Sequence, residues 1–349
     1  MVIDMLTSGF LELLDYLSAH VLTCLIPAFF IAGGIAVFVS SASILKYFGP
    51  QTKKYISYSV GSVSGIVLAV CSCTILPLFA GIFKKGAGLG PAITFLYAGP
   101  AINLLAIVLT ARRLGWELGL GRALGAIVFA IVIGVIMSLI FFKEERDKKA
   151  SFMNLPQPEG GKTGLQMLAY FGVLVAILLF GTADIPTWSK VAILIALLNS
   201  LAIILFRWYS REEVVDWLRE TYSLVKLIFP ILLVGVFVAG ALGEIIPPEW
   251  ISGYVGENTF QANFLASLFG SLMYFSTLTE VPILEMLRGL GMSNGPSLSL
   301  LLAGPAISLP NMLAIRNIMG TKKTAVFIML VVIMASITGM IFGNLFPDI

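Results

Sequence analysis

Residues 71–105 read CSCTILPLFAGIFKKGAGLGPAITFLYAGPAINLL, and residues 276–310 read STLTEVPILEMLRGLGMSNGPSLSLLLAGPAISLP. The two stretches align without a gap, so each residue of the second lies 205 positions after its counterpart in the first. Many glycines and prolines coincide, and the run AGPAI begins at Ala98 and again at Ala303. Chance does not align so many backbone-determining residues. The chain therefore contains an internal repeat.

The composition is that of a membrane protein. Of the 349 residues, 58% are hydrophobic and only 12% are charged, whereas soluble domains carry about 25% charged residues. This excludes an ordinary cytosolic enzyme, a disordered chain and a nucleic-acid binder. The three cysteines, Cys24, Cys71 and Cys73, are too few for a disulfide framework. The first basic residue is Lys46, so we expect no cleavable secretory signal and a multi-pass protein in the cell membrane.

Uncharged segments long enough to cross a bilayer recur along the whole chain. A spanning helix needs about 20 apolar residues, and a membrane interior forces each segment to satisfy its own backbone groups. The alternating pattern of barrel strands is absent. We therefore predict an all-α integral membrane protein with about 8–10 transmembrane helices. The segments are 19–40, 56–76, 91–111, 123–142, 164–183, 190–206, 224–243, 260–277, 296–315 and 324–346.

Polar stretches divide the chain into regions. Residues 143–162 are rich in charge, proline and glycine, which predicts a flexible cytoplasmic linker. Residues 207–222 place Trp208 and Trp217 among charges, as in an amphipathic helix at the membrane interface. The predicted regions are a first membrane repeat over 1–142, the linker, two connecting helices over 163–206, the interfacial helix and a second repeat over 223–349.

Loop charges predict that the two repeats are inverted. Loop 41–56 carries three lysines, whereas its counterpart 244–257 carries three glutamates and no basic residue. Because basic loops stay in the cytoplasm, the two loops lie on opposite sides. Each copy contains two hydrophobic segments, and two crossings would return the chain to the side on which it started. The loop charges require an odd number of crossings, so we expect one broken or re-entrant segment in each copy. This arrangement places Arg112, Arg113 and Arg122 outside.

The repeated Gly-Pro pairs indicate where the segments break. Proline removes a backbone donor, and glycine tolerates unusual dihedrals. Transporters with inverted repeats bind substrate near the bilayer midplane, where discontinuous helices meet. A simple packing kink is the alternative, but recurrence at equivalent positions favours a break. The pairs are Gly99-Pro100 and Gly304-Pro305.

The run Cys71-Ser72-Cys73-Thr74 precedes Pro77 in the first copy. Residues two apart on a helix point about 200° away from each other, so both thiols face one ligand only if the backbone is unwound. Pro77 favours unwinding because it cannot donate to residue 73. Thiols select soft partners such as copper(I) or a trivalent metalloid. The alternative is that these are small residues for helix packing, which is our interpretation of Cys24.

The second copy carries Thr279, Glu280 and Pro282 at the equivalent place. An ionisable group in a membrane segment is expensive and is a functional candidate, so Glu280 is the candidate for proton coupling. The alternative is a carboxylate at the membrane edge, paired with a group such as Arg288.

Polar residues also follow the Gly-Pro pairs. Asn103, Ser308 and Asn311 could bind substrate or hydrogen-bond between helices. We assign no role to His20, the only histidine. No Walker A sequence, HExxH, GxGxxG or set of metal ligands is present, so we expect no enzyme activity, cofactor or metal, and an ATP-driven pump would need a partner chain.

The sequence CSCTILPLFAGIFKKGAGLGPAITFLYAGPAIN, with LLAGPAISLPN in the second copy, resembles the signature of the ArsP-like predicted permeases. That family includes efflux proteins for trivalent organoarsenicals. The resemblance implies a secondary permease that exports a small thiophilic or metalloid solute across the lipid bilayer, with Cys71 and Cys73 as the carried-over thiols. The Gly-Pro pairs are the signature breaks.

The residues alone leave two other functional interpretations open. A membrane thiol-redox protein could pass reducing equivalents through Cys71 and Cys73, because closely spaced cysteines form strained, easily reduced disulfides. A permease for an unrelated solute, a channel or a structural subunit would not use the thiols at all. Replacing both cysteines by serine separates the readings, since a permease for a non-thiophilic solute survives the change.

Overall fold

The structure is a computed structural model that describes residues 2–18, 25–38, 47–48, 52–68, 72–144, 164–182, 186–243, 254–273 and 280–347. Within these ranges the chain forms helices and turns, with no strand. The predicted all-α membrane fold is confirmed. The linker residues 145–163 and the residues Cys24, His20, Cys71 and Thr279 lie outside the described part of the chain.

Among the described residues, four helices are long and apolar enough to cross a membrane. They are α8 (Trp116–Ile140), α11 (Thr187–Trp208), α12 (Arg211–Gly243) and α18 (Thr321–Leu345). Two further spans are possible if each of two bent helix pairs is counted once. Shorter apolar helices add α2 (Ile26–Phe38), α5 (Ser72–Lys84) and α10 (Gly164–Thr182). The chain is thus a multi-pass membrane protein, and the total of 8–10 crossings stays a prediction.

The repeated sequence forms the same series of helices twice. In the second series α18 begins and ends 205 residues after α8. The first series is α4 (Lys54–Leu68), α5, α6 (Leu89–Ala101), α7 (Leu104–Arg113) and α8, and the second is α14 (Phe260–Leu272), α15 (Glu280–Gly289), α16 (Asn294–Ile307), α17 (Leu309–Met319) and α18. Gly86 and Gly291 take corresponding left-handed conformations, with φ of 93° and 102°. We call these series the first and second halves.

Hydrogen bonds between helices also recur. The Thr94 hydroxyl on α6 donates to the Ala130 carbonyl on α8 over 2.9 Å, and the Ser299 hydroxyl on α16 donates to the Ala335 carbonyl on α18 over 3.0 Å. These donors and acceptors are counterparts in the repeat. The two halves therefore pack alike internally, and their inverted orientation in the membrane stays a prediction.

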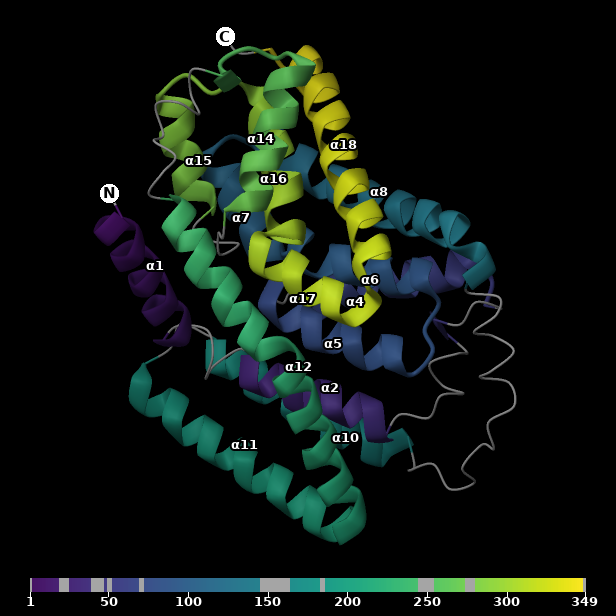
Figure 1. The fold of residues 1–349 in the computed structure, drawn as a ribbon. Helices are drawn as coiled ribbons and strands as arrows, with labels where there is room; N and C mark the ends of the chain where they lie inside the picture. Colours follow the sequence, from purple (N-terminus) through teal and green to yellow (C-terminus); the bar gives the residue numbers. More distant parts are fainter. Residues whose placement is uncertain are drawn as a thin grey trace.

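Small residues allow these helices to pack closely. A Cβ on Gly134 would lie 2.7 Å from the Gly90 carbonyl oxygen, and a Cβ on Gly339 would lie 2.5 Å from that of Gly295. Close backbone approach through small residues is how membrane helices associate, since lipid supplies no hydrophobic drive. Figure 1 shows α14, α16 and α18 running side by side as a result.

The halves meet along α6 and α16. The Tyr97 hydroxyl on α6 donates to the Leu302 carbonyl on α16 over 2.8 Å, and Leu302 is the counterpart of Tyr97 in the repeat. A contact between counterparts is what a local two-fold axis between the halves produces. Both Tyr97 and the backbone around Leu302 are buried, so this axis lies in the interior of the protein.

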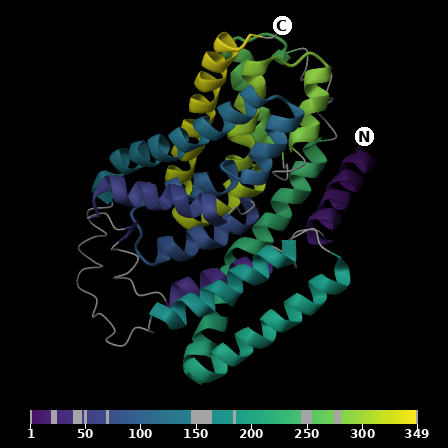
Figure 2. The ribbon, with the colours of Figure 1, turned by 180° about the vertical axis from the view of Figure 1, so that it is seen from behind.

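Helices outside the repeat pack around this core. α12 contacts α1 (Val2–Tyr16), α2 and α17, and α10 contacts α2 and α11. Rings of Phe38, Tyr170, Tyr209 and Trp217 pack together where these helices meet, with centroids 4.6–6.3 Å apart. α11 runs along the outer edge, as both views show (Figure 1, Figure 2).

The predicted interfacial helix over 207–222 is not a separate element. Residues 211–222 are the first turns of α12, which continues to Gly243. Ser210 and Glu213 form a reciprocal capping box that starts this helix, and no glycine or proline interrupts it before Pro230. The location of these turns at the membrane interface and the other region boundaries stay predictions.

Candidate functional site

Each half contains one bent helix pair. α6 and α7 meet at 46°, and α16 and α17 also meet at 46°. The Gly-Pro pairs, however, lie within the last turns of α6 and α16 and not at the breaks themselves. The helix completes its turn because the fixed φ of proline is helical. α6 and α16 end one and two residues after their prolines, at Ala101 and Ile307.

The residues at the breaks explain why a new helix starts at once. The Asn103 side-chain oxygen accepts a hydrogen bond from the Ala106 amide over 3.3 Å, which caps α7. In the second half Ser308 is extended, with φ −55° and ψ 153°. Pro310 then occupies the first turn of α17, where no amide donor is needed.

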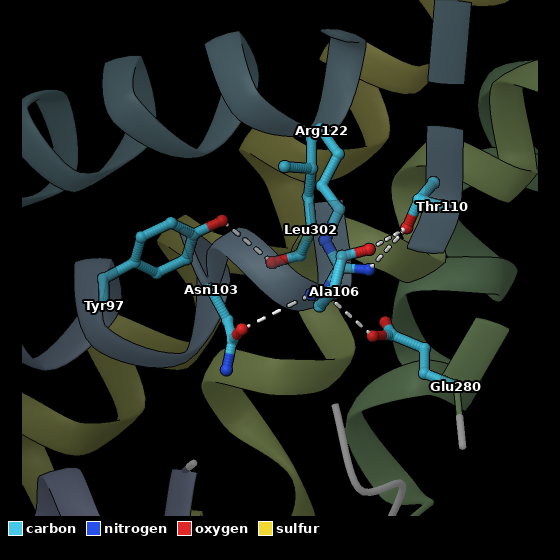
Figure 3. A network of polar contacts seen from close by, with 7 residues as sticks. All are labelled: Tyr97, Asn103, Ala106, Thr110, Arg122, Glu280 and Leu302. Atoms are coloured by element: carbon cyan, nitrogen blue, oxygen red, sulfur yellow. Dashed lines mark hydrogen bonds and ion pairs between the residues drawn. The ribbon is translucent and has the colours of Figure 1, made fainter. Parts of the chain in front are cut away.

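A buried ion pair joins the two halves beside these breaks. The Arg122 Nη2 on α8 lies 3.1 Å from the Glu280 Oε2 on α15, and the exposed fractions of the two side chains are 0% and 1%. Arg122 also donates to the Thr110 hydroxyl on α7 over 3.1 Å, and that hydroxyl donates to the Ala106 carbonyl over 2.7 Å. Figure 3 shows the guanidinium between Thr110 and Glu280.

The pair does not satisfy all of its polar atoms. The Arg122 Nε and the Glu280 Oε1 have no hydrogen-bond partner among the described residues. Burying two charges is expensive, and their attraction offsets that cost only with good geometry and further hydrogen bonds. The pair therefore carries unpaired polar atoms in the interior, which native proteins rarely leave without a structural or functional reason.

The location of Arg122 corrects the predicted topology at that residue. We expected Arg122 outside, together with Arg112 and Arg113, but it lies seven residues into α8 and is fully buried. Its neighbours on the same face, Gly119 and Ala126, are small and buried, so the long side chain has space to enter the interior. An arginine on the glycine and alanine face of an apolar helix is the sequence signal that we missed.

The alternative for Glu280 is also wrong. We considered a carboxylate at the membrane edge that pairs with Arg288. Instead, Glu280 is buried and pairs with Arg122, while the Arg288 guanidinium donates to the Leu114 carbonyl over 3.3 Å. The glutamate is therefore an interior group, as the functional interpretation requires.

The counterpart positions of the repeat carry no charge. The counterparts of Glu280 and Arg122 are Ile75 and Phe327, and both are fully buried. Buried ion pairs can often be replaced by apolar side chains at little cost in stability, and the protein has made that replacement at its own equivalent position. The charges thus make the centre of the molecule asymmetric.

Glu280 and Ile75 also occupy equivalent surroundings. The Ile75 side chain lies 2.7 Å from the position that a Cβ on Gly99 would take, and the Glu280 Oε1 lies 3.4 Å from the same position on Gly304. Each glycine immediately precedes the proline of its half. The acidic side chain is therefore held against the bent pair of the second half.

The predicted unwinding around the cysteines is wrong over residues 72–77, the part of that stretch that the structure describes. α5 begins at Ser72 and continues through Pro77, and Pro282 lies in the first turn of α15. Prolines near a helix start cost few hydrogen bonds, so the helices tolerate them. Cys73 lies in the first turn of α5 with its side chain outside the description, and Thr74 is fully buried in α5, outside the network of Figure 3.

The predicted polar residues lie at the breaks. Asn103, Ser308 and Asn311 are all buried. The structure brings Asn103 close to the Arg122 network through Ala106 (Figure 3). Ser308 and Asn311 lie at the second break, where the Ser308 hydroxyl and the Asn311 side-chain oxygen have no hydrogen-bond partner among the described residues.

The buried pair predicts a large difference between two glutamates on α15. Replacing Glu280 by alanine leaves the Arg122 charge buried and uncompensated, so we expect a loss of about 3–5 kcal/mol in unfolding free energy. Glu285 is the matched control, because it forms only an exposed pair with Arg113 over 3.9 Å, worth at most about 1 kcal/mol. Thermal unfolding in detergent measures both. Equal shifts for Glu280→Ala and Glu285→Ala would contradict the account.

Comparison with known proteins places the chain in a family. It is 46% identical over 343 residues to the UPF0718 protein MJ0584 of Methanocaldococcus jannaschii. The aligned region covers 95% of this chain and 94% of that protein. It is 21% identical over 286 residues to the UPF0718 protein YraQ of Escherichia coli, covering 82% and 66% of the two chains.

A third relative, from Streptococcus mutans, bears a name that describes a subunit of a two-component membrane permease complex. It is 21% identical over 304 residues, covering 85% of this chain and 83% of that protein. No solved structure matches this chain. The sequence model of a family described as predicted permease, ArsP_1, matches residues 6–344 of this chain. The chain therefore belongs to the ArsP_1 family of predicted permeases.

Proposed function

We propose that this protein is a secondary permease that exports a small thiophilic solute, such as a trivalent organoarsenical. The observation that carries the proposal is the buried Arg122–Glu280 pair, which joins the two halves beside both bent helix pairs. A permease must open to each side in turn, and inverted halves that rock about a central site do this. An interior ion pair between the halves can form and break as they move.

The first half supplies the thiols in this proposal. Ile75 packs on Gly99 at the first bent pair, and Cys73 lies two residues before Ile75 in the first turn of α5. The backbone that carries Cys73 is therefore close to the first break. Cys71 and Cys73 would bind a trivalent arsenical through sulfur, as the resemblance to the ArsP-like permeases implies. The separation of about 200° between residues two apart holds only within a helix, and Cys71 precedes Ser72, where α5 begins.

Glu280 is the proposed coupling group. An ionisable side chain inside a membrane protein marks a functional position by default. The Arg122 guanidinium beside it stabilises the charged form of the carboxylate. Uptake of a proton from one side removes the attraction for Arg122 and frees the two halves to move. Loss of the proton on the other side restores the pair.

The thiol proposal predicts different effects for the three cysteines. In an arsenic-sensitive host that expresses the wild type, we expect lower accumulation of trivalent methylarsenite. The Cys71→Ser/Cys73→Ser variant should lose at least about tenfold in export, because its soft ligands are gone. Cys24→Ser is the matched control and should export like the wild type. Unchanged export by the double variant would rule out thiol binding, and no protection by the wild type would reject an arsenical as substrate.

The coupling proposal predicts that the Glu280→Gln variant loses uphill transport but keeps exchange. In everted vesicles with an imposed pH gradient, the wild type should accumulate methylarsenite in proportion to the gradient. Glu280→Gln keeps the shape and one oxygen but cannot carry the proton, so accumulation should fall to the level without a gradient. Exchange of methylarsenite between equal pools serves as the control for a folded carrier. If Glu280→Gln still accumulates substrate uphill, another group couples transport.

A further inference from the structure

Among the described residues of the second half, the Ser293 hydroxyl at the start of α16 and three further buried oxygen atoms have no hydrogen-bond partner, and these three belong to residues at or beside the second break. They are the Glu280 Oε1, the Ser308 hydroxyl and the Asn311 Oδ1. All three side chains are at least 98% buried. Leaving such an atom unpaired in the interior costs about 1–3 kcal/mol, so three in one region call for an explanation.

The three atoms follow one another along the second break. The Glu280 Oε1 lies against Gly304 of α16. Ser308 comes four residues after Gly304, about one helical turn or roughly 6 Å further along the axis. Asn311 comes three residues after Ser308, in the first turn of α17. The residues at and beside the second break thus carry three unpaired oxygens.

The Ser308 hydroxyl is free despite its location at a helix start. Ser308 occupies the N-cap position of α17, where a serine side chain ordinarily accepts a hydrogen bond from an amide of the first turn. No such bond is present. In the first half the equivalent segment is different, because Asn103 does cap α7 and Ile75 replaces the glutamate. The unpaired oxygens are therefore a property of the second break.

The charge at this place decides the class of ligand. The negative charge of Glu280 is already balanced by Arg122 at 3.1 Å, so the pair together is neutral. A cation would meet the guanidinium, and an anion would meet the carboxylate and two oxygen acceptors. A neutral molecule that donates hydrogen bonds satisfies the oxygens without adding an uncompensated charge.

We infer that the second break binds a small uncharged solute carrying at least two hydroxyl groups, which donate hydrogen bonds to the Glu280 Oε1 and the Asn311 Oδ1, while the Ser308 hydroxyl donates to an oxygen of the solute. This rests on the proposed function and narrows it, since it assigns the solute to its neutral hydroxide form. A trivalent organoarsenical in water is such a dihydroxide. Each thiol that bonds to arsenic replaces one hydroxyl group, which leaves as water with the thiol proton. The second break would therefore hold the dihydroxide form, before the thiols of the first half bind it or after they release it.

The same site explains how a proton and a solute could be exchanged. The Glu280 Oε1 accepts a hydrogen bond from the solute, and a proton on this carboxylate competes for that oxygen. The other titratable groups nearby are Arg122 on α8 and Tyr97 on α6 (Figure 3). Arg113 of α7 faces Glu285 instead, and α16 contains no titratable residue. Mutually exclusive occupancy is what an exchange of solute for proton requires.

Boric acid is the probe that tests this site separately from the thiols. It is a neutral trihydroxide near neutral pH and does not bind thiols. Proteoliposomes that contain the full chain are loaded with boric acid of one boron isotope, and entry of the other isotope is measured. We expect faster exchange than in protein-free liposomes, both for the wild type and for Cys71→Ser/Cys73→Ser. A failure of thiol-dependent export would leave this result unaffected.

The variant Ser308→Ala/Asn311→Leu should lower the protein-dependent exchange by about tenfold or more, because two hydrogen-bond partners are lost. Ser297→Ala is the matched control on α16, since its hydroxyl already donates to the Ser293 carbonyl over 2.7 Å, and it should exchange like the wild type. Ser308→Ala alone should unfold at the wild-type temperature or above, because its hydroxyl contributes no bond to the fold. A drop in that temperature would indicate a structural role and overturn the inference.

Two further results would also overturn it. One is boric acid exchange by the wild type that equals the rate in protein-free liposomes. The other is unchanged exchange by Ser308→Ala/Asn311→Leu. Formate and tetramethylammonium serve as charged probes of similar size, and faster exchange of either one than of boric acid would show that the site selects an ion.

Discussion

The buried ion pair between Arg122 and Glu280 is the interaction on which the proposed function depends. It lies in the interior, where an unpaired charge is not tolerated, and it connects helices of different halves. The equivalent position of the repeat is filled by Ile75 and Phe327, so packing alone does not demand charges there. A costly feature that the fold can omit is best explained by movement, because a pair that forms and breaks distinguishes two states of the protein.

The ion pair lies beside the two helix breaks, because Arg122 contacts α7 and Glu280 contacts α16. Proline near the end of α6 and α16 removes backbone donors, and the chain starts a new helix after one or two residues. Backbone that is not helical is tolerated at membrane depth only when it is buried in protein or lines a cavity. Both bends lie against the centre of the molecule, where the halves meet through Tyr97 and Leu302. One break is fully capped, and the other leaves oxygens unpaired, which gives the two halves different chemistry on one scaffold.

Much of this architecture could be predicted from the sequence. The gapless repeat and the Gly-Pro pairs located the bent segments, because glycine and proline act on the backbone where they stand. The buried state of Ser308 and Asn311 agreed with their place in the apolar segment 296–315, whereas Glu280 is buried although it lies between two predicted segments. What failed depended on side chains meeting across the fold. Arg122 was counted as a loop charge, although a face of small residues carries it inward, and Pro77 was expected to unwind a helix that tolerates it in its early turns. Residues near a helix start follow rules that a local pattern does not reveal.

The most direct test replaces each charged residue of the pair by its counterpart in the other half. In Arg122→Phe/Glu280→Ile both charges are replaced by the side chains that occupy the counterpart positions. The account predicts an unfolding temperature at or above that of the wild type, since apolar replacement of a buried pair is neutral or stabilising by about 1–4 kcal/mol, together with complete loss of solute flux in proteoliposomes. Wild-type flux in this variant, or a large loss of stability, would show that the pair does not serve transport in the way proposed.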